Sequence, residues 1–568
     1  MRVLKKKKEL LALALSALLI VSGCGASGEG SKNDDTSSVT ITNDADADGK
    51  GTEEQNIVES DVSDEDTLTI AINDEINNID IIHAYSYWVD LVLNGIAEGL
   101  FYYDSDSQVQ SRLVESYEHP DEKTYIYTIK SGVTFSTGDP LTADDVVFSL
   151  ERQRNPENGG ELSWMFENVE SIEKTGDLEV TVKLSEPDVT WQDSLATTAS
   201  LVVSKKYFEE HSEDFGTADG GLVGSGPYKI ESWVPGEQIV LVANENYWDT
   251  SKTVEFKKVV LDYIADTSVS KLALEQGEID YVGPLTPDDA HELEGVDGIN
   301  VQSPYPYSEQ YLSFNTSRAP FDDVNFRKAI SYAVDRQAIV DSLFYGKYAE
   351  VGTGLLYGPE TVTVETELWA DYFENVEKYE RNIDTAKEYL AKSEAGKKGG
   401  DINVSLKYPA NKTTDEAVAI IVQQNLAEIG ITVQLEGISA SEVSTLRYGG
   451  SETRDYDILL TGWGADYPDP AGIISPMFLS ANNIPGGSNW FEYKSDEYDD
   501  LILESNLESD PKVRAKELQD ASTILAEDQP AVALYYPDYL VALSDKVDYE
   551  VSPMFLYNQY LGDFKKAK

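Results

Sequence analysis

The sequence has 568 residues, a formal net charge of −59 and 41% hydrophobic residues. So acidic a surface repels nucleic acid and anionic lipid headgroups, which excludes both as main partners. The length exceeds a single hydrophobic core, which stops growing at roughly 250–300 residues, so several packed units are expected. The single cysteine, Cys24, excludes a disulfide framework and a Cys-rich metal site.

The first residues have the layout of a signal peptide. Basic residues between Arg2 and Lys8 precede an apolar run at residues 10–21, which is shorter than the roughly 20 residues that span a bilayer. The run ends in Val-Ser-Gly before Cys24, which resembles the lipobox of bacterial lipoproteins. That resemblance implies removal of residues 1–23 and lipidation of Cys24; an uncleaved anchor is the alternative.

Residues 24–66 follow as a predicted acidic tether. The stretch is rich in Gly, Ser, Thr, Asn, Asp and Glu and has no aromatic residue. Such a segment cannot bury enough apolar surface to offset the entropy of ordering it. We therefore expect it to be disordered.

From Thr67 onward the pattern is that of a mixed α/β protein. Leu68, Ile70 and Ile72 alternate with polar neighbours, which predicts a half-buried strand. Further strands are predicted at residues 125–130, 179–184, 238–243, 258–264, 403–407 and 456–460.

Helix signals separate these strands. Thr142 followed by Asp145 has a capping-box layout, with Asp in place of the usual Glu or Gln. Residues 324–344 carry apolar side chains at helical spacing, and Thr414 can cap a helix that Gly430 ends. An alternating strand follows directly, so the order helix, glycine, strand indicates an α/β unit.

Short motifs follow one another along this part of the chain. They are EGLFY at 98–102, YTIKSGVTFSTGDPLTADDV at 127–146, GSGPY at 224–228, NENYW at 244–248, NFRKAI at 325–330 and WGADYPDP at 463–470. Together they resemble extracellular solute-binding protein family 5, the oligopeptide- and dipeptide-binding lipoproteins of ABC importers.

The resemblance implies a two-lobe periplasmic-binding-protein-like α/β fold with mixed sheets, in the type II, three-domain form that binds peptides. The lobes would close over a ligand. The expected parts are residues 67–97, 222–318 and 531–568 for lobe I, 98–221 for its inserted small domain, and 319–530 for lobe II.

The same resemblance suggests the ligand contacts. The Asp of the Trp-x-x-Asp segment pairs with the free amino group of a peptide in this family, which implies that role for Asp466. Trp463 would supply a flat apolar wall, and Tyr535 or Tyr536 a hydrogen bond to the ligand backbone. What would hold the ligand's carboxylate is open; Arg318, Arg447 and Arg454 are candidates because arginine binds carboxylates in a bidentate manner.

These features predict a monomeric binding protein that is not an enzyme and uses no cofactor or metal. It would capture short peptides and deliver them to the permease subunits of an ABC importer, with its lipid as the only membrane contact. It would sit on the extracellular face of the bacterial cytoplasmic membrane, or in the periplasm of a Gram-negative cell. The alternatives are an oligosaccharide or nickel-chelate ligand, a signalling receptor and a secreted hydrolase.

Overall fold

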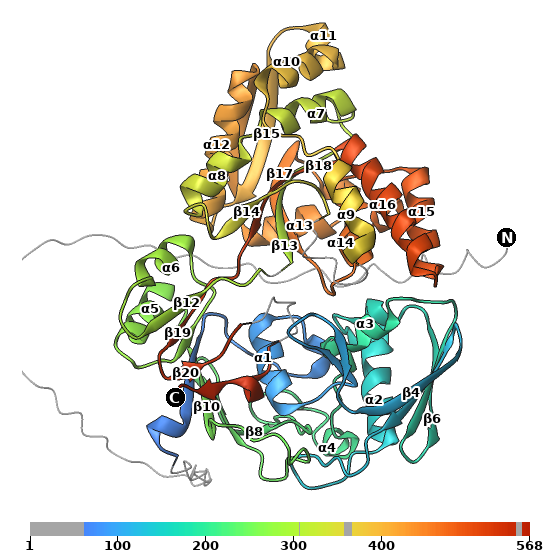
Figure 1. Cartoon of the computed structure of the whole chain (residues 1–568), viewed down its shortest axis with the longest axis vertical. Helices are drawn as coiled ribbons and strands as arrows, with labels where there is room; N and C mark the ends of the chain where they lie inside the picture. The colour runs from blue at the N-terminus through green and yellow to red at the C-terminus, as the bar shows by residue number, and fades with distance from the viewer. Residues whose placement is uncertain (1–61, 306, 357–365, 552–558) are drawn as a thin grey trace, which may run out of the picture. The chain divides into compact units, whose positions relative to one another are not determined.

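The computed structural model describes residues 62–305, 307–356, 366–551 and 559–568 (Figure 1). All described residues belong to one compact unit. The predicted signal peptide, Cys24 and the predicted tether up to residue 61 lie outside the described residues.

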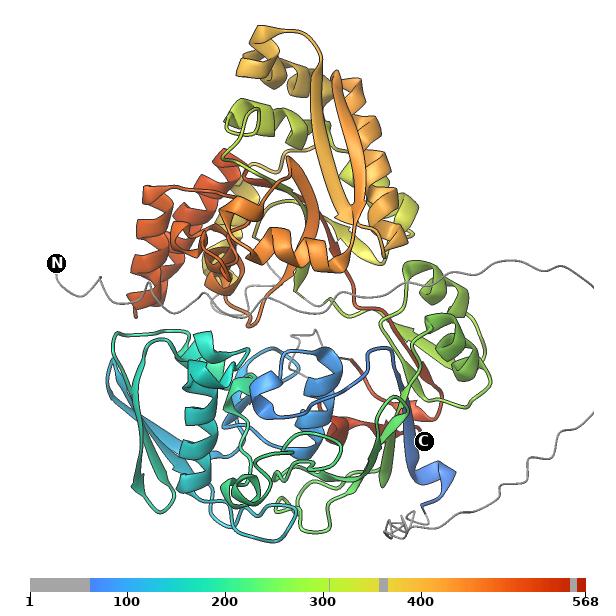
Figure 2. The same cartoon turned by 180° about the vertical axis from the view of Figure 1, so that it is seen from behind.

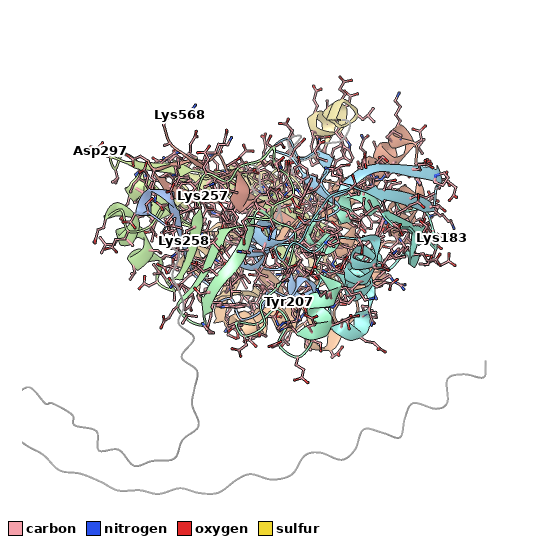
Figure 3. The ribbon with its side chains drawn as sticks, turned by 90° about the horizontal axis from the view of Figure 1, so that it is seen from below. Lys183, Tyr207, Lys257, Lys258, Asp297 and Lys568 are labelled. Atoms are coloured by element: carbon pink, nitrogen blue, oxygen red, sulfur yellow. The ribbon has the colours of Figure 1, made fainter. Side chains whose placement is uncertain are left out.

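The last residues of the predicted tether have contacts with the folded unit. The expected tether extended to Asp66, but Asp64–Asp66 form a 3₁₀ turn, and Asp66 pairs with Lys566 near the C-terminus. The Asp66 carbonyl also accepts the Lys257 N–H at 2.7 Å. Lys257 directly precedes Lys258, the first residue of strand β10 (Lys258–Tyr263), and both residues are labelled in Figure 3. These contacts fix the last residues of the predicted tether to the folded unit.

A seven-stranded sheet collects strands from distant parts of the chain. Its order is β12 (Ile299–Gln302), β19 (Val541–Ser544), β11 (Tyr281–Val282), β1 (Thr67–Ile72), β10 (Lys258–Tyr263), β9 (Gln238–Ala243) and β8 (Tyr228–Val234). β1 runs parallel to both of its neighbours, β10 and β11, while the other pairs are antiparallel. The Leu68, Ile70 and Ile72 side chains are buried, as predicted.

A second, six-stranded sheet is built mainly from residues between 308 and 537; we call the chain up to residue 305 the first part and the chain from residue 307 the second part. Its order is β14 (Ala349–Val351), β18 (Ala531–Pro537), β13 (Ser308–Phe314), β17 (Ile458–Gly464), β15 (Ile402–Pro409) and β16 (Ile431–Ile438). β15 is parallel to β16 and β17, and the remaining pairs are antiparallel, so the predicted mixed α/β class is confirmed. The ranges expected for lobe I include β13 and β18, which hydrogen-bond within this sheet; strand pairing of this kind cannot be seen in local sequence.

The other strands form smaller sheets. The segment between β1 and β8 holds a four-stranded antiparallel sheet in the order β4 (Val114–Asp121), β5 (Thr124–Ile129), β7 (Glu179–Leu184) and β6 (Val169–Gly176). Two-stranded sheets pair β2 (Phe101–Tyr103) with β3 (Val109–Ser111) and β20 (Val547–Asp548) with β21 (Lys565–Lys566).

Helices surround these sheets. In the first part they are α1 (Tyr87–Ile96), α2 (Ala143–Arg154), α3 (Trp191–Leu195), α4 (Lys205–Glu210), α5 (Thr267–Glu275) and α6 (Pro287–Leu293). Later in the chain come α7 (Val324–Ala333), α8 (Arg336–Leu343), α9 (Thr366–Asn375), α10 (Ile383–Lys392), α11 (Glu394–Lys398), α12 (Thr413–Glu428), α13 (Ala440–Tyr448), α14 (Pro470–Phe478), α15 (Asp496–Leu507) and α16 (Pro511–Asp528). α12 lies along β15, and α15 and α16 lie side by side (Figures 1 and 2).

Local signals predicted some helix ends and missed others. The capping box of Thr142 and Asp145 is present at the start of α2. Residues 324–344 form two helices rather than one, because Val334 is extended and the Asp335 side chain accepts the Ala338 N–H at 3.0 Å to cap α8. Thr414 is not a cap: α12 begins one residue earlier, after Lys412, without a side-chain capping bond.

Three of the sequence motifs meet at one buried carboxylate. Glu98, 2% exposed, accepts hydrogen bonds from Ser225 Oγ at 3.0 Å, Tyr247 Oη at 3.0 Å and Trp248 Nε1 at 2.6 Å. Gly224 precedes Ser225 in the GSGPY motif. A Cβ atom at this position would lie 2.2 Å from the Ile96 carbonyl oxygen, so only glycine fits here. These motifs therefore fix the junction between α1 and β8.

We expect Glu98→Gln to lower the free energy of unfolding by about 2 kcal/mol, because an amide leaves buried donors without the charged acceptor they have now. Urea denaturation followed by tryptophan fluorescence measures the loss. Glu115→Gln, at an exposed position on β4, is the matched control. Equal midpoints for the two variants would contradict the assigned role of Glu98.

Candidate functional site

The end of β17 positions two of the predicted site residues. Trp463 is the next-to-last residue of this strand, in register with Glu309 of β13. The chain then turns through Asp466 to Asp469, whose side chain accepts the Ala471 N–H at 2.8 Å and caps α14. Asp466 therefore sits in a short loop between a strand and a capped helix, and it is only 6% exposed.

A cavity of about 710 Å³ lies against this loop. This volume is typical of small-ligand sites, which span roughly 300–1,000 Å³. Residues from distant stretches of chain line it, among them Tyr85, Glu161, Trp164, Glu167 and Asp188 from the first part and Tyr448, Trp463, Asp466 and Tyr467 from the second. The structure thus places the predicted pair Trp463 and Asp466 on one cavity wall.

Aromatic rings reach the cavity from both parts of the chain. Tyr85 and Trp164 are 45% and 39% exposed, respectively, and both line the cavity. Burial of its hydroxyl raises the pKa of Tyr85, and the charge of Asp466 raises it further, so the phenol keeps its proton as a hydrogen-bond donor. Sequence reasoning missed Tyr85, Trp164 and Tyr448, since none of them belongs to a recognisable motif.

The other two predicted tyrosines lie elsewhere. Tyr535 and Tyr536 of β18 are buried and are not among the residues lining the cavity. The ring of Tyr535 packs 4.5 Å from that of Phe344. The Tyr536 hydroxyl accepts the Thr353 and Gly354 N–H groups at 3.0 and 3.1 Å. Their contact with a ligand stays a prediction.

The three candidate arginines differ in their surroundings. Two hold carboxylates already: Arg318 pairs with Asp455 at 3.1 Å, and Arg454 pairs with Glu492 at 2.8 Å. The Arg447 guanidinium lies 4.2 Å from the centre of the Trp490 ring and 5.0 Å from that of Tyr448, a cavity residue. Within the described residues, Arg447 forms no ion pair with a carboxylate.

A polar cluster lies next to the site. Asp469 forms a bidentate ion pair with Arg514, whose Nη1 and Nη2 atoms donate to the two carboxylate oxygens at 2.7 and 2.8 Å. Asp193 of α3 accepts a hydrogen bond from the Tyr103 hydroxyl at 3.1 Å. Burial, followed by the nearby charge of Asp469, raises the pKa of Asp193 to about 7.

The raised pKa of Asp193 predicts a pH-dependent stability. The folded protein holds this proton up to about pH 7, whereas an unfolded Asp releases it near pH 4. The folded state therefore binds more protons in this window, and stability from Asp193 is lost as the pH rises from about 4 to about 7. Urea denaturation at several pH values measures the free energy of unfolding. Between about pH 4 and pH 7 this free energy should fall less in Asp193→Asn than in the wild type. An equal fall in both proteins would contradict the raised pKa of Asp193.

The mixed sheets and the cavity lined from two parts of the chain define a periplasmic-binding-protein fold of the peptide-binding type. The chain belongs to the bacterial extracellular solute-binding proteins, family 5, whose sequence profile matches residues 108–485. The resemblance inferred from the motifs is confirmed. Proteins of this family bind solutes and are not enzymes.

Individual relatives agree with this assignment. The glutathione-binding protein GsiB of Salmonella paratyphi A is 25% identical over 469 residues, which cover 82% of this chain and 88% of GsiB. The oligopeptide-binding protein AppA of Bacillus subtilis, solved with a nonapeptide, is 25% identical with a TM-score of 0.71, covering 88% of this chain and 99% of AppA. CtaP of Listeria monocytogenes, an ABC transporter substrate-binding protein, has a TM-score of 0.76 at 23% identity, with 88% and 99% covered.

Within the described part of the chain, no helix is long and apolar enough to cross a membrane.

Proposed function

We propose that this protein captures short peptides with a free amino terminus in the 710 Å³ cavity and hands them to an ABC-type importer. The observation that carries the proposal is the position of Asp466: a carboxylate, 6% exposed, on the wall of a cavity of ligand size. A carboxylate in such a place binds an ammonium group through a charge-assisted hydrogen bond, which is about twice as strong as a neutral one.

The rest of the lining suits a peptide as well. Trp463 and Tyr448 offer flat apolar faces, while Tyr85 carries a hydroxyl that can donate to a peptide carbonyl. Arg447 lies against the lining residue Tyr448 and forms no ion pair among the described residues, but it does not itself line the cavity, so the group that would bind the ligand's carboxylate stays open. The names of GsiB and AppA, which bind glutathione and oligopeptides, support a peptide ligand here too.

Thermal unfolding with candidate ligands tests the proposal. The full chain, freed of co-purified ligand by unfolding and refolding, is melted with pools of di- to pentapeptides, with the same peptides acetylated, and with a panel of oligosaccharides. A ligand at a hundred times its Kd adds about 2.7 kcal/mol of stability. We expect free peptides to raise the melting temperature and acetylated ones to raise it far less.

The sugar panel addresses a second candidate ligand. Trp164, Trp463 and Tyr448 all line the cavity, and aromatic faces also stack on sugar rings. If only oligosaccharides stabilise the protein, the solute-binding assignment stands and the peptide proposal fails. If free and acetylated peptides act equally, the peptide ligand stands but Asp466 is not its amino anchor.

Lipidation at Cys24 and delivery to a permease complete the proposal. The lipobox-like sequence before Cys24 supports the anchor, and the ABC-transporter assignment of CtaP supports the importer. Labelling of cells with a fatty-acid analogue should mark the wild type and fail to mark Cys24→Ala. Label retained in the variant would reject this anchor.

A further inference from the structure

The cavity lining has a strong charge bias. Four carboxylates line it, Glu161, Glu167, Asp188 and Asp466, and no Lys, Arg or His of the described residues does so. The walls have low-dielectric aromatic surfaces, so the field of these charges is weakened less than on an open surface. A ligand that carries only one ammonium group would leave most of this negative charge uncompensated.

Two of the four carboxylates already have a role. Asp466 is the proposed partner of the ligand's amino terminus. Asp188 accepts the Thr190 N–H at 3.0 Å, the Thr190 hydroxyl at 2.9 Å and the Asn168 amide at 3.3 Å, which fixes the start of α3. Glu161 and Glu167 remain, both exposed and both without an ion pair to any described residue.

These two glutamates flank Trp164 in the sequence. Trp164, 39% exposed, lies in the 3₁₀ turn Ser163–Phe166, three residues from Glu161 and three from Glu167. Neither glutamate is part of the turn: Glu161 precedes its N-cap residue, Leu162, and Glu167 is its C-cap residue. Both line the same cavity as Trp164. None of the described Lys or Arg side chains lies over this ring.

We infer that this turn selects peptides with a lysine or arginine side chain, held against the Trp164 ring between the Glu161 and Glu167 carboxylates. A ring face attracts a cation, and the two carboxylates neutralise it. The inference rests on the proposed peptide function and adds to it a class of preferred peptide: basic ones bind best, and acidic ones, repelled by the same charges, bind worst.

Isothermal titration of the full chain with three matched tripeptides tests the preference. Ala-Lys-Ala, Ala-norleucine-Ala and Ala-Glu-Ala share a free amino terminus and differ in one side chain, and a second set carries the variable residue at position three. We expect the lysine peptide of at least one set to bind about tenfold tighter than its norleucine analogue, since exposed ion pairs and cation–π contacts each contribute a few-fold. The ratio should shrink as salt rises from about 0.05 to about 0.5 M.

Variants locate the source of the preference. Glu161→Gln/Glu167→Gln and, separately, Trp164→Ala should each lower the lysine-to-norleucine ratio to about threefold or less. The matched control is Glu170→Gln/Glu173→Gln, which makes the same charge change at exposed positions of β6 outside the cavity lining and should keep the ratio. The control also corrects for the overall charge of this acidic protein.

The outcomes are distinct. Lysine and norleucine peptides that bind equally, or a control variant that lowers the ratio as much as the cavity variant does, would overturn the inference while the peptide function stands. If no peptide in the sets or in the pools binds, the proposed function itself fails, and the inference fails with it.

Discussion

Replacing Asp466 by alanine is expected to weaken binding of peptides with a free amino terminus by about thirtyfold or more. Removing one partner of a buried charge pair costs about 2–5 kcal/mol, because the other charge stays desolvated without its counter-ion. Asp466 is 6% exposed, so little water can replace its carboxylate. Isothermal titration with a peptide found in the pools measures the change in Kd.

The control separates the ammonium contact from general damage. Asp500→Ala removes the same charge from an exposed position on α15, outside the cavity lining, and should leave Kd within about twofold. The two changes, Asp466→Ala and acetylation of the peptide, should not add, because both remove the same contact. Additive losses would show that Asp466 acts elsewhere than at the amino terminus.

Local sequence signals correctly predicted features that depend only on neighbouring residues, such as single strands and helix caps. β7 and β9 occupy the predicted residues 179–184 and 238–243, since alternation of apolar side chains is a property of one strand. The capping box at Thr142 was readable for the same reason. The break between α7 and α8 was missed because the intervening apolar residues keep helical spacing, although Asp335 ends that continuity by capping the second helix.

The site was predictable only through its motif. Asp466 and Trp463 belong to one recognisable segment, and they line the cavity together. Tyr85 and Trp164 contribute to the same cavity from more than 280 residues away in the chain, and no pattern near them indicates it. Conversely, the motifs around Glu98 carry the family resemblance but form a buried hydrogen-bond network and do not line the cavity.

Removing only one partner of the Asp469–Arg514 pair beside the site is expected to destabilise the fold strongly. We expect Arg514→Met to lower the free energy of unfolding by about 3–5 kcal/mol, because methionine fills space but leaves the Asp469 carboxylate buried without its partner. The Asp469 side chain is 8% exposed and that of Arg514 13%, and the guanidinium also donates to the Ser505 carbonyl at 3.1 Å. The unfolded fraction in guanidinium chloride, followed by tryptophan fluorescence, measures the loss.

Two further variants identify the buried charge as the cause. Lys397→Met breaks an exposed ion pair with Glu394, in which the two side chains are 57% and 68% exposed, and should cost less than about 1 kcal/mol. Asp469→Asn combined with Arg514→Met removes both charges while Asn can still cap α14, so we expect the double variant to recover at least half of the loss. A double variant as unstable as Arg514→Met alone would mean that the packing of the arginine side chain, and not the unpaired carboxylate, accounts for the loss.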